Sequence, residues 1–329
     1  MIINIENISL IIPSRNSFTD LAVLLSGIPL WRTIPDEIII VDSSTTSIEL
    51  DDSFQLFCSA NNIKVKIIVH KRLYPGHARN IGIKESSNQL LAFLDTSTLP
   101  TPDWLNSCLY LLRKSQASGV LGSTVYHAYN HTAKILRAST YGKNKVVTLP
   151  GSILSKDVFK TCGLFIENIR AGEDGDWMNR LDLHNIQTEQ STEYLSYNGL
   201  TDMPISSVLK KWYRNYASSV HLPFNRAHIG FYYYAFSALI VLLAFNWNQL
   251  LAAWDENSIF YIPNVTKISI LSALLIYIFL RGIWLPFKKG DRLRFLIPFN
   301  FLFISALSFG LDLSKMAAFF LSRFCKGKD

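Results

Sequence analysis

Four short β-branched runs in the first hundred residues most constrain the fold of this chain. They are Ser9–Ile12, Glu37–Val41, Val65–Val69 and Leu90–Leu94, and stretches long enough to form helices separate them. Near-continuous apolar strands that alternate with helices are typical of a parallel sheet covered on both faces. The sequence therefore predicts an α/β domain with Rossmann-like layers.

Polar and turn-forming residues follow the ends of these runs. In open α/β sheets ligands bind beyond the carboxyl ends of the strands, so these residues mark the expected site. After the first, second and fourth runs they are Pro13, Ser14, Arg15, Asn16, Asp42 and Asp95. The third run leads to Gly76–Gly82, which we expect to be a flexible entry into a helix with Arg79 near its start. A helix N-terminus with an arginine favours an anion, and the alternative is that Arg79 pairs with a carboxylate such as Asp95.

Two later segments complete the pattern. Gly151 and Ser152 lie in a strand-like run, and further on Glu173, Asp174 and Trp177 open a predicted helix. Read without any further context, Glu173 and Asp174 are the acidic residues that the first turn of a helix prefers.

Taken together, in their order and spacing, these residues resemble the family-2 glycosyltransferases of the GT-A fold over about residues 8–185. The resemblance implies a nucleotide-diphospho-sugar transferase domain. It implies that the Pro13–Asn16 loop contacts the nucleotide, that Asp42 accepts hydrogen bonds from the nucleoside, and that Gly76 and Arg79 lie by the diphosphate. A turn or helix-capping role is the alternative for Asp42.

The metal-binding motif of the family is incomplete in this chain. Asp95 stands where the family carries its DxD motif, but Ser97 replaces the second carboxylate. Magnesium often uses few protein carboxylates, so Asp95 and the substrate phosphates could together hold Mg²⁺ or Mn²⁺. Two alternatives stay open: cationic side chains neutralise the diphosphate, or the protein is inactive.

The acidic pair resembles the ED motif of the family, in which the aspartate is the general base. The resemblance assigns Asp174 to proton removal from the acceptor in an inverting displacement, with Glu173 orienting the acceptor. It also assigns Gly151, Ser152 and Trp177 to the pocket for the donor sugar and acceptor.

Composition divides the chain into two parts. Residues 1–222 mix charges, turns and short apolar runs and are expected to form the GT-A domain, including an interfacial amphipathic helix at about residues 205–217 with Trp212 at headgroup level. Residues 223–329 are expected to form an all-α membrane region. Its predicted spans are at about residues 229–247, 267–287 and 295–311, and a buried core helix is the alternative for each. Arg281, inside the second span, must snorkel or face protein.

The placement of positive charge predicts a topology. The net charge of +7 comes largely from basic residues beside the apolar spans, and no nucleic-acid-binding motif is present, so we expect membrane lipids and no nucleic acid as partners. We expect no signal peptide and a cytosolic first domain, on the inner (plasma) membrane, with the basic turn Lys288–Arg294 on the same side. A full third crossing would place the basic C-terminus outside, so either the last segment re-enters or Asp312–Phe324 lies in the interface. The four scattered cysteines suit a reducing compartment.

The sequence thus predicts an inverting, non-processive transferase. Its partners would be a nucleotide-diphosphate sugar, with a UDP-sugar as the family default, and a lipid-linked or glycan acceptor in bacterial polysaccharide or glycolipid synthesis. The main alternative is a catalytically inert protein that binds nucleotide sugar or scaffolds a membrane complex. A processive synthase is disfavoured because the Gln-x-x-Arg-Trp motif is absent, and a dehydrogenase because no glycine-rich turn follows the first strand.

Overall fold

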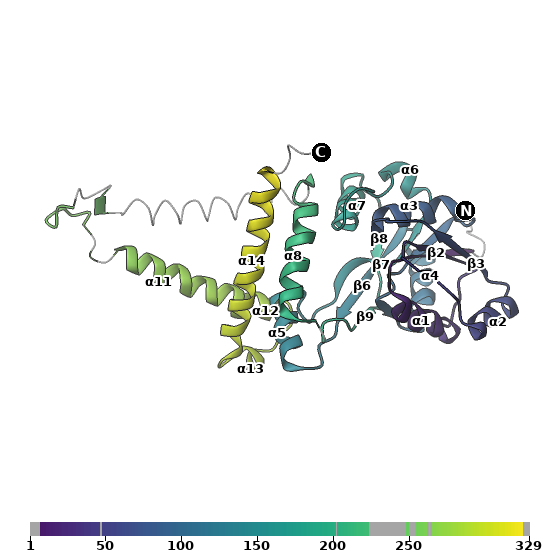
Figure 1. Ribbon diagram of the computed structural model, residues 1–329, viewed down its shortest axis with the longest axis horizontal. Helices are drawn as coiled ribbons and strands as arrows, with labels where there is room; N and C mark the ends of the chain where they lie inside the picture. Colours follow the sequence, from purple (N-terminus) through teal and green to yellow (C-terminus); the bar gives the residue numbers. More distant parts are fainter. Residues whose placement is uncertain are drawn as a thin grey trace.

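The computed structural model describes residues 7–46, 48–201, 203–223, 248–249, 254–261, 263 and 265–324. A mixed sheet with helices on both faces forms the first part of the chain, and a group of long helices forms the last part (Figure 1). The first predicted span, residues 229–247, lies outside the described residues.

The predicted parallel strands are confirmed. They are β1 (Ile8–Ser14), β2 (Glu37–Asp42), β3 (Lys64–Val69) and β4 (Leu90–Phe93), side by side in the order β3-β2-β1-β4. The register pairs Ser14 with Asp42, so the polar residues that end the two central strands lie at the same edge of the sheet.

The sheet continues beyond β4 with strands of both directions. Its other strands are β7 (Val146–Ser155), β6 (Gly119–Tyr126), β8 (Thr188–Gln190), β9 (Leu195–Tyr197) and β5 (Thr98–Pro100). Strand β7 pairs antiparallel with both β4 and β6, whereas β8 and β9 pair parallel with β6. The parallel pattern predicted from the first hundred residues therefore describes only one half of a mixed sheet.

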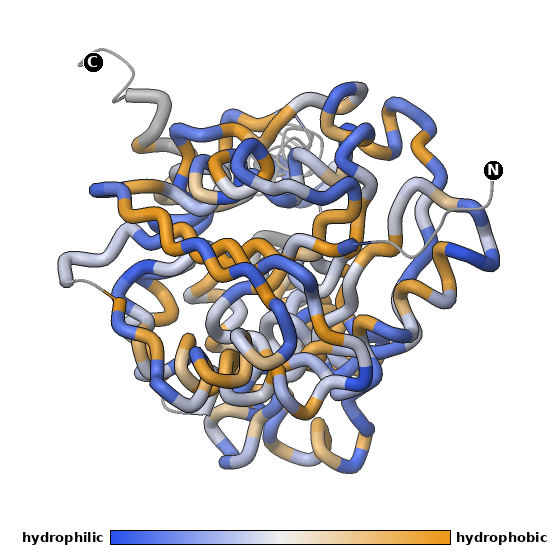
Figure 2. The backbone as a smooth tube through the Cα atoms, turned by 90° about the vertical axis from the view of Figure 1, so that its right-hand side faces the viewer, coloured by the Kyte–Doolittle hydropathy of each residue, from blue (hydrophilic) through white to orange (hydrophobic). Residues whose placement is uncertain are grey.

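Alternate side chains of the strands supply two cores, because successive residues of a strand point to opposite faces. Leu10 and Ile12 pack on one face, and Ile11 packs on the other. Figure 2 shows hydrophobic stretches along neighbouring strands in the middle of this part of the molecule. The first face is covered by α1 (Phe18–Gly27), α2 (Asp52–Ala60) and α4 (Trp104–Ser115), and the second by α3 (Pro75–Glu85), α6 (Val158–Cys162) and α7 (Glu173–Leu183).

Glu37, the first residue of β2, is a buried carboxylate that should contribute to stability. Its buried carboxylate lies 2.8 Å from Lys66 Nζ and accepts hydrogen bonds from Ser9 and Ser87. Burial raises the pKa of Glu37, but these partners outweigh it and lower the pKa from 4.5 to about 2. The stabilisation is present above pH 4.5 and is lost as the pH falls towards 2, and Glu37→Gln should cost roughly 3 kcal/mol at pH 7.

The measurement is the melting temperature of the full chain in detergent between pH 7 and pH 2. Glu37→Gln should melt lower at pH 7 and flatten the profile below pH 4.5, whereas the exposed Glu189→Gln should leave both unchanged. An unaltered pH slope in Glu37→Gln would contradict the assignment.

Long helices follow the sheet. The predicted amphipathic helix is confirmed as α8 (Ile205–Ser219), which lies between the sheet and α14 (Asn300–Phe324), as Figure 1 shows. Trp212 faces inward, in a cluster with Tyr141 of the loop after α5 (His131–Ser139) and with Leu311 of α14. Trp212 is thus partly buried against protein while the adjacent Tyr213 is exposed, and the interfacial position of this helix stays a prediction.

Two helices in the described residues are long and apolar enough to cross a membrane, by length and composition: Leu271–Lys288 and Asn300–Phe319. The first is built from α11 (Val265–Ile278), a π-helical segment (Phe279–Trp284) and α12 (Leu285–Lys288). Arg281 faces protein, as predicted, and pairs with Asp312 of α14.

The third predicted span differs from the observed helix at both ends. Residues 293–296 form the short α13 (Leu293–Leu296), and Pro298 precedes α14, where it removes no internal helix hydrogen bond. Helix α14 then continues without a break from Asn300 to Phe324, so Asp312–Phe324 is not a separate interfacial segment. The predicted span ended at residue 311 because Asp312 is charged. In the structure Arg281 pairs with Asp312, so the helix can continue past this residue.

The basic turn between the two apolar helices is docked on the sheet domain. Arg137 of α5 lies 3.2 Å from the buried carboxylate of Asp291, and the backbone amides of Lys143 and Asn144 donate to the carbonyl of Lys289. Gly290 adopts φ +94°, and a Cβ there would lie 2.1 Å from the side chain of Asn144. A glycine is therefore required for this close contact.

Candidate active site

A cavity of about 370 Å³ opens at the carboxyl ends of β1 and β4, beside the N-termini of α3 and α7. Most of the residues predicted from strand ends and helix starts line it: Pro13, Ser14, Arg15, Arg79, Asp95, Glu173 and Asp174. A larger hollow of about 470 Å³ lies between α1 and the segment before α2, but none of the predicted site residues lines it.

The ends of β1 and β2 leave two buried oxygens without a partner. Asp42 is buried, and its Oδ1 accepts a hydrogen bond from Ser44 at 2.6 Å. Within the described residues, Asp42 Oδ2 and Ser14 Oγ have no hydrogen-bond partner. Ser14 also lines the cavity, whereas the fully buried Asp42 does not and lies behind it, next to Ser43 of the lining. Because buried polar atoms are normally paired, the two oxygens are unusual at this edge of the sheet.

Asn16, in the loop after β1, makes hydrogen bonds through its side chain to the loop after β2. Its side chain accepts hydrogen bonds from the amide and hydroxyl of Thr45, and its own amide donates to Ser44 Oγ at 2.7 Å. It is not among the residues that line the cavity. Asn16 joins the loops after β1 and β2 and so holds the wall of the cavity in place.

Arg79 joins the two acidic parts of the site. Its guanidinium donates to Glu173 at 2.7 Å and to Asp95 at 2.8 Å, and only 3% of the residue is exposed. The predicted alternative, an arginine paired with a carboxylate, is therefore what the structure shows. Its second partner, Glu173, is 94 residues away in the sequence.

Gly76 permits this arrangement by its size. It is the second residue of α3, and a Cβ there would lie 2.3 Å from the carbonyl oxygen of Ile166 and 3.1 Å from Glu173 Cγ. The prediction of a flexible glycine is therefore wrong at this position, because Gly76 is buried within a helix. The missing side chain lets α3 approach the start of α7.

The acidic pair divides into a buried and an accessible carboxylate. Glu173 is buried, and within the described residues its Oε2 has no partner. Burial raises the pKa of Glu173, the charge of Arg79 opposes this rise, and Asp174 adds to it. Asp174 is half-buried and lines the cavity, and its Oδ1 accepts a hydrogen bond from the amide of Gly175 at 2.8 Å. Asp174 is therefore the carboxylate better placed to meet a reacting group.

Asp95 provides one carboxylate towards the cavity. Its side chain is 37% exposed, and its Oδ1 is held by Arg79. The neighbouring Thr96 and Ser97 also line the cavity. Among the described residues, no group of three or more histidine, cysteine, aspartate or glutamate side chains could hold a metal. The residues present fit a divalent ion that takes one protein carboxylate and completes its shell from phosphates and water.

Comparison with known proteins decides the family. Residues 9–165 match the family model described as glycosyl transferase family 2. The chain carries a family 2 glycosyltransferase domain. This confirms the family and the α/β GT-A fold class that the motifs predicted.

Curated relatives resemble the same part of the chain. An uncharacterized glycosyltransferase of Rickettsia conorii is 26% identical over 185 residues, which are 53% of this chain and 30% of the relative. Glycosyltransferase AglE of Haloferax volcanii is 23% identical over 185 residues, 53% of this chain and 60% of the relative. A pre-mycofactocin glycosyltransferase of Mycobacterium tuberculosis is 25% identical over 195 residues, 54% of this chain and 39% of the relative. The match spans 60% or less of each of these relatives.

Solved structures show a weaker similarity. The mannosyltransferase PcManGT from Pyrobaculum calidifontis, solved with GDP-Man and Mn²⁺, is 12% identical, with a TM-score of 0.49 and coverage of 94% of this chain and 87% of that one. TarS residues 1–349 from S. aureus, solved with UDP-GlcNAc, is 14% identical, with a TM-score of 0.44 and coverage of 97% and 90%.

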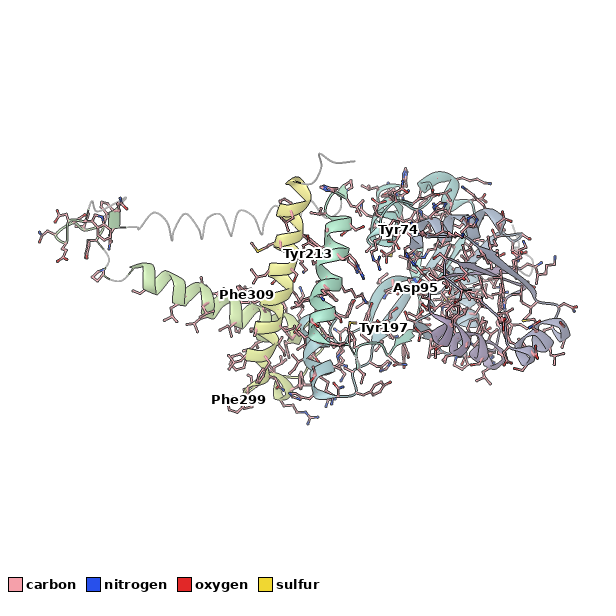
Figure 3. All side chains as sticks on the ribbon, viewed as in Figure 1. Tyr74, Asp95, Tyr197, Tyr213, Phe299 and Phe309 are labelled. Atoms are coloured by element: carbon pink, nitrogen blue, oxygen red, sulfur yellow. The ribbon has the colours of Figure 1, made fainter. Side chains whose placement is uncertain are left out.

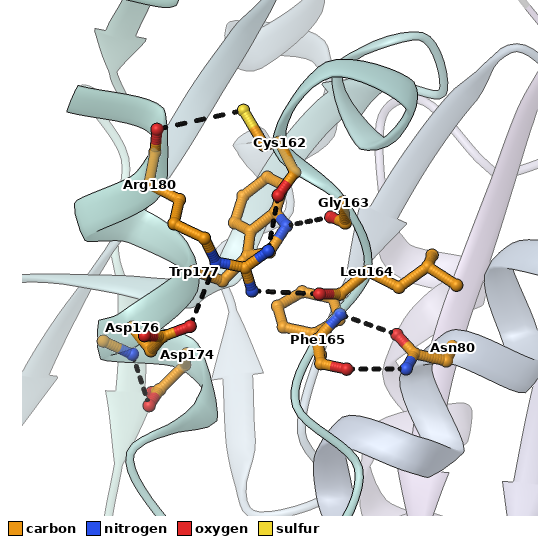
Figure 4. Close-up of polar contacts among 10 residues, drawn as sticks. Asn80, Cys162, Gly163, Leu164, Phe165, Asp174, Asp176, Trp177 and Arg180 are labelled. Carbon is orange, nitrogen blue, oxygen red and sulfur yellow. Dashed lines mark hydrogen bonds and ion pairs between the residues drawn. The ribbon is translucent and has the colours of Figure 1, made fainter. Parts of the chain in front are cut away.

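Three residues assigned to the sugar pocket lie instead in the interior of the glycosyltransferase domain. Trp177 is fully buried and stacks on Phe159, with ring centroids 4.7 Å apart. Its indole hydrogen is donated to the carbonyl of Gly163, as Figure 4 shows. Gly151 accepts a hydrogen bond from Trp104 through its carbonyl, and the buried Ser152 accepts one from the amide of Gly122. None of the three lines the cavity, so we assign them to packing.

The sequence analysis missed Arg170, which lines the cavity, and Tyr126, which lies near its carboxylates without lining it. Arg170, which precedes α7, lines the cavity and adds a positive charge opposite Asp95 and Asp174. Tyr126 ends β6 and stacks on Tyr141, with ring centroids 3.7 Å apart. Because Tyr126 also ends a strand, the rule that found Asp95 would have found it. Burial raises the pKa of Tyr126, and the charges of its neighbours, including Asp174 and Asp95, raise it further.

Figure 3 places Tyr74, Asp95 and Tyr197 in the part of the glycosyltransferase domain nearest to α8. Tyr197 lies beside Tyr126, with ring centroids 5.3 Å apart. Of these two tyrosines and Tyr74, only Tyr74 lines the cavity, so Tyr126 and Tyr197 form an aromatic group outside its lining.

Proposed function

We propose that this protein transfers a sugar from a nucleotide-diphosphate sugar to an acceptor hydroxyl, by an inverting and non-processive displacement at the membrane surface. The observation that carries the proposal is the cavity at the strand ends. It is lined by Arg79, Asp95 and Asp174 and lies beside the unpartnered oxygens of Asp42 and Ser14.

The nucleoside would bind at the ends of β1 and β2. The free oxygens of Ser14 and Asp42 suit the hydroxyl and amide hydrogens of a ribose and a base, and uridine is the base that the family resemblance implies. The diphosphate would then lie towards Arg15 and Arg170, whose charges favour an anion. Arg79 is already occupied by Glu173 and Asp95, so its role here is to position these carboxylates.

A divalent ion, Mg²⁺ or Mn²⁺, would be held by Asp95 at the edge of this site. When bound, such an ion neutralises charge on the departing nucleotide diphosphate. Asp174 would remove the proton of the acceptor hydroxyl as its oxygen attacks the sugar, because a single accessible carboxylate within reach of the acceptor suffices as general base. Glu173, fixed by Arg79, would orient the acceptor.

The acceptor would be lipid-linked or close to the membrane. Two apolar helices follow the glycosyltransferase domain, and the basic turn between them is docked on it. Basic residues between spans favour the cytoplasmic side, so the domain would face the cytoplasm at the inner membrane. The incomplete metal motif favours a second candidate, an inert protein that binds nucleotide sugar without turnover.

A thermal-shift screen of nucleotide sugars tests the donor and the metal together. A UDP-sugar at 100 times its dissociation constant should stabilise the protein by roughly 2.7 kcal/mol, and more with Mg²⁺ or Mn²⁺ than without. Asp95→Asn should remove the gain from metal, and Asp182→Asn, an exposed residue of α7, should keep it.

Each result of the screen has a distinct meaning. The absence of a shift with every nucleotide sugar would refute donor binding. Equal shifts with and without metal, unaffected by Asp95→Asn, would refute the metal site. A metal-dependent shift without any product from membrane lipid acceptors would favour the inert protein.

A further inference from the structure

A further, smaller pocket lies between the glycosyltransferase domain and the long helices. It measures about 150 Å³, and its lining combines aromatic and polar side chains from α8, from α14 and from the loops after α5 and before α7. The lining residues are Tyr141, Ala171, Trp212, Asn215, Tyr216, Ser219 and Lys315. Ala171 lines both this pocket and the cavity at the strand ends, so the loop before α7 borders the two hollows, and Asp174 follows in the first turn of that helix.

Aromatic rings connect this pocket with the proposed base. Trp212 meets Tyr141 edge to face, with ring centroids 5.8 Å apart, and Tyr141 stacks on Tyr126. Asp174 is among the charges that raise the pKa of both tyrosines, below the effect of burial. Such rings offer apolar faces with a polar edge, a surface that suits a sugar ring or an apolar chain next to a polar group.

Lys315 belongs to a group of basic side chains around Asp312. Both carboxylate oxygens of Asp312 are occupied by Arg281, at 3.0 and 3.1 Å, and Tyr277 donates to the same carboxylate. Lys315 Nζ lies 3.6 Å from Asp312, beyond hydrogen-bond distance, and faces the pocket. Lys289 belongs to the same group: burial lowers its pKa, and the charges of Arg281 and Lys315 lower it further.

The balance of charge in this group is not neutral. Arg281 and Lys315 share the single carboxylate of Asp312. The ammonium of Lys289 donates to the carbonyl of Thr140 and lies close enough to be repelled by both. Three cationic side chains in a partly buried setting therefore have one carboxylate among them. Uncompensated charge away from water is costly, so an anion bound in the pocket would be stabilised. A phosphate monoester carries about −1.5 to −2 at neutral pH, which matches this excess.

We propose that this pocket binds a phosphate group of the acceptor, with Lys315 as its ligand, and so holds the acceptor hydroxyl towards Asp174. The inference rests on the proposed transferase function and names the class of acceptor, a phosphate ester. This phosphate ester is either a membrane lipid, whose apolar chain would extend from the pocket along α14, or a water-soluble phosphorylated compound.

The test measures binding of three probes to the full chain in a neutral detergent: decyl phosphate, decanol and inorganic phosphate. Lys315→Met keeps the aliphatic chain and removes the charge, and the Arg281–Asp312 pair stays in place. Its affinity for decyl phosphate should be about tenfold lower, since a charged hydrogen bond is lost. Lys315→Arg should retain most of the binding, and the exposed Lys160→Met should bind like the wild type.

The outcomes separate this inference from the transferase proposal. The thermal shift with UDP should be equal in all variants, and its absence in the wild type would refute the donor site while leaving the phosphate result intact. Binding of inorganic phosphate that is lost in Lys315→Met would support the site with a soluble acceptor, and binding of decyl phosphate alone would support it with a lipid. Equal binding of decyl phosphate by Lys315→Met, or equal affinity for decanol, would overturn the inference.

Discussion

Asp174→Asn should lower the rate of sugar transfer by roughly 10² to 10⁴, the usual contribution of a general base. The amide of asparagine has the shape of the carboxylate and can still accept the hydrogen bond from Gly175, so the local fold should persist. It cannot take a proton from the acceptor hydroxyl. Donor binding should therefore remain, because the proposed nucleotide contacts are at the ends of β1 and β2, away from Asp174.

The measurement combines UDP release in the presence of membrane lipid acceptor with the thermal shift caused by the UDP-sugar. Asp182→Asn lies on the exposed side of the same helix and serves as the matched control, with full turnover expected. Turnover by Asp174→Asn within threefold of the wild type would remove Asp174 from the mechanism. A lost thermal shift would place it in donor binding instead.

Arg79→Met should have the largest effect on stability, about 3–5 kcal/mol, the cost of leaving a buried partner uncompensated. The guanidinium is the only ion-pair partner of the buried Glu173 in the described residues, and it also holds Asp95. Without it, burial would drive Glu173 towards its neutral form, since burial is the main reason that its pKa is raised. Activity should be lost with the geometry of both carboxylates.

Chemical unfolding of the full chain in detergent measures this effect. Arg32→Met is the matched control, because Arg32 pairs at 3.4 Å with Asp103 on the exposed surface, where such pairs contribute about 0–1 kcal/mol. The double variant Arg79→Met/Glu173→Gln should recover part of the loss, because it removes the unpaired charge as well. A double variant whose loss equals the sum of the single losses would show that the two side chains act independently.

Local patterns were sufficient to find the acidic residues of the site. Asp42 and Asp95 follow apolar runs, and Glu173 and Asp174 open a helix. The end of a strand and the start of a helix depend mainly on residues close in sequence, so such positions can be read from one chain. The same rule applied to Tyr126 would have found the aromatic group that this tyrosine forms with Tyr141 and Tyr197.

Patterns of residue type did not predict which way a side chain faces. Trp177 lies one turn beyond Asp174 on the same helix, yet it packs in the core against Phe159 while Asp174 lines the cavity. Trp212 was expected at a membrane surface, and its ring faces Tyr141. The direction of a ring on an amphipathic helix depends on which other elements cover that face, and these elements lie far away in sequence.

The sequence by itself determined the positions of the parallel strands, the candidate carboxylates at a strand end and a helix start, and the presence of apolar C-terminal helices, because each follows from the spacing of residues within one segment. Only the tertiary structure decided that Arg79 bridges Asp95 and Glu173. The same is true of the pairing of Arg281 with Asp312, and of the pocket that Lys315 faces beside the loop before α7. These contacts join segments that are far apart in the sequence, so no local pattern of residues predicts them. They form because charges that become buried when the elements pack require partners.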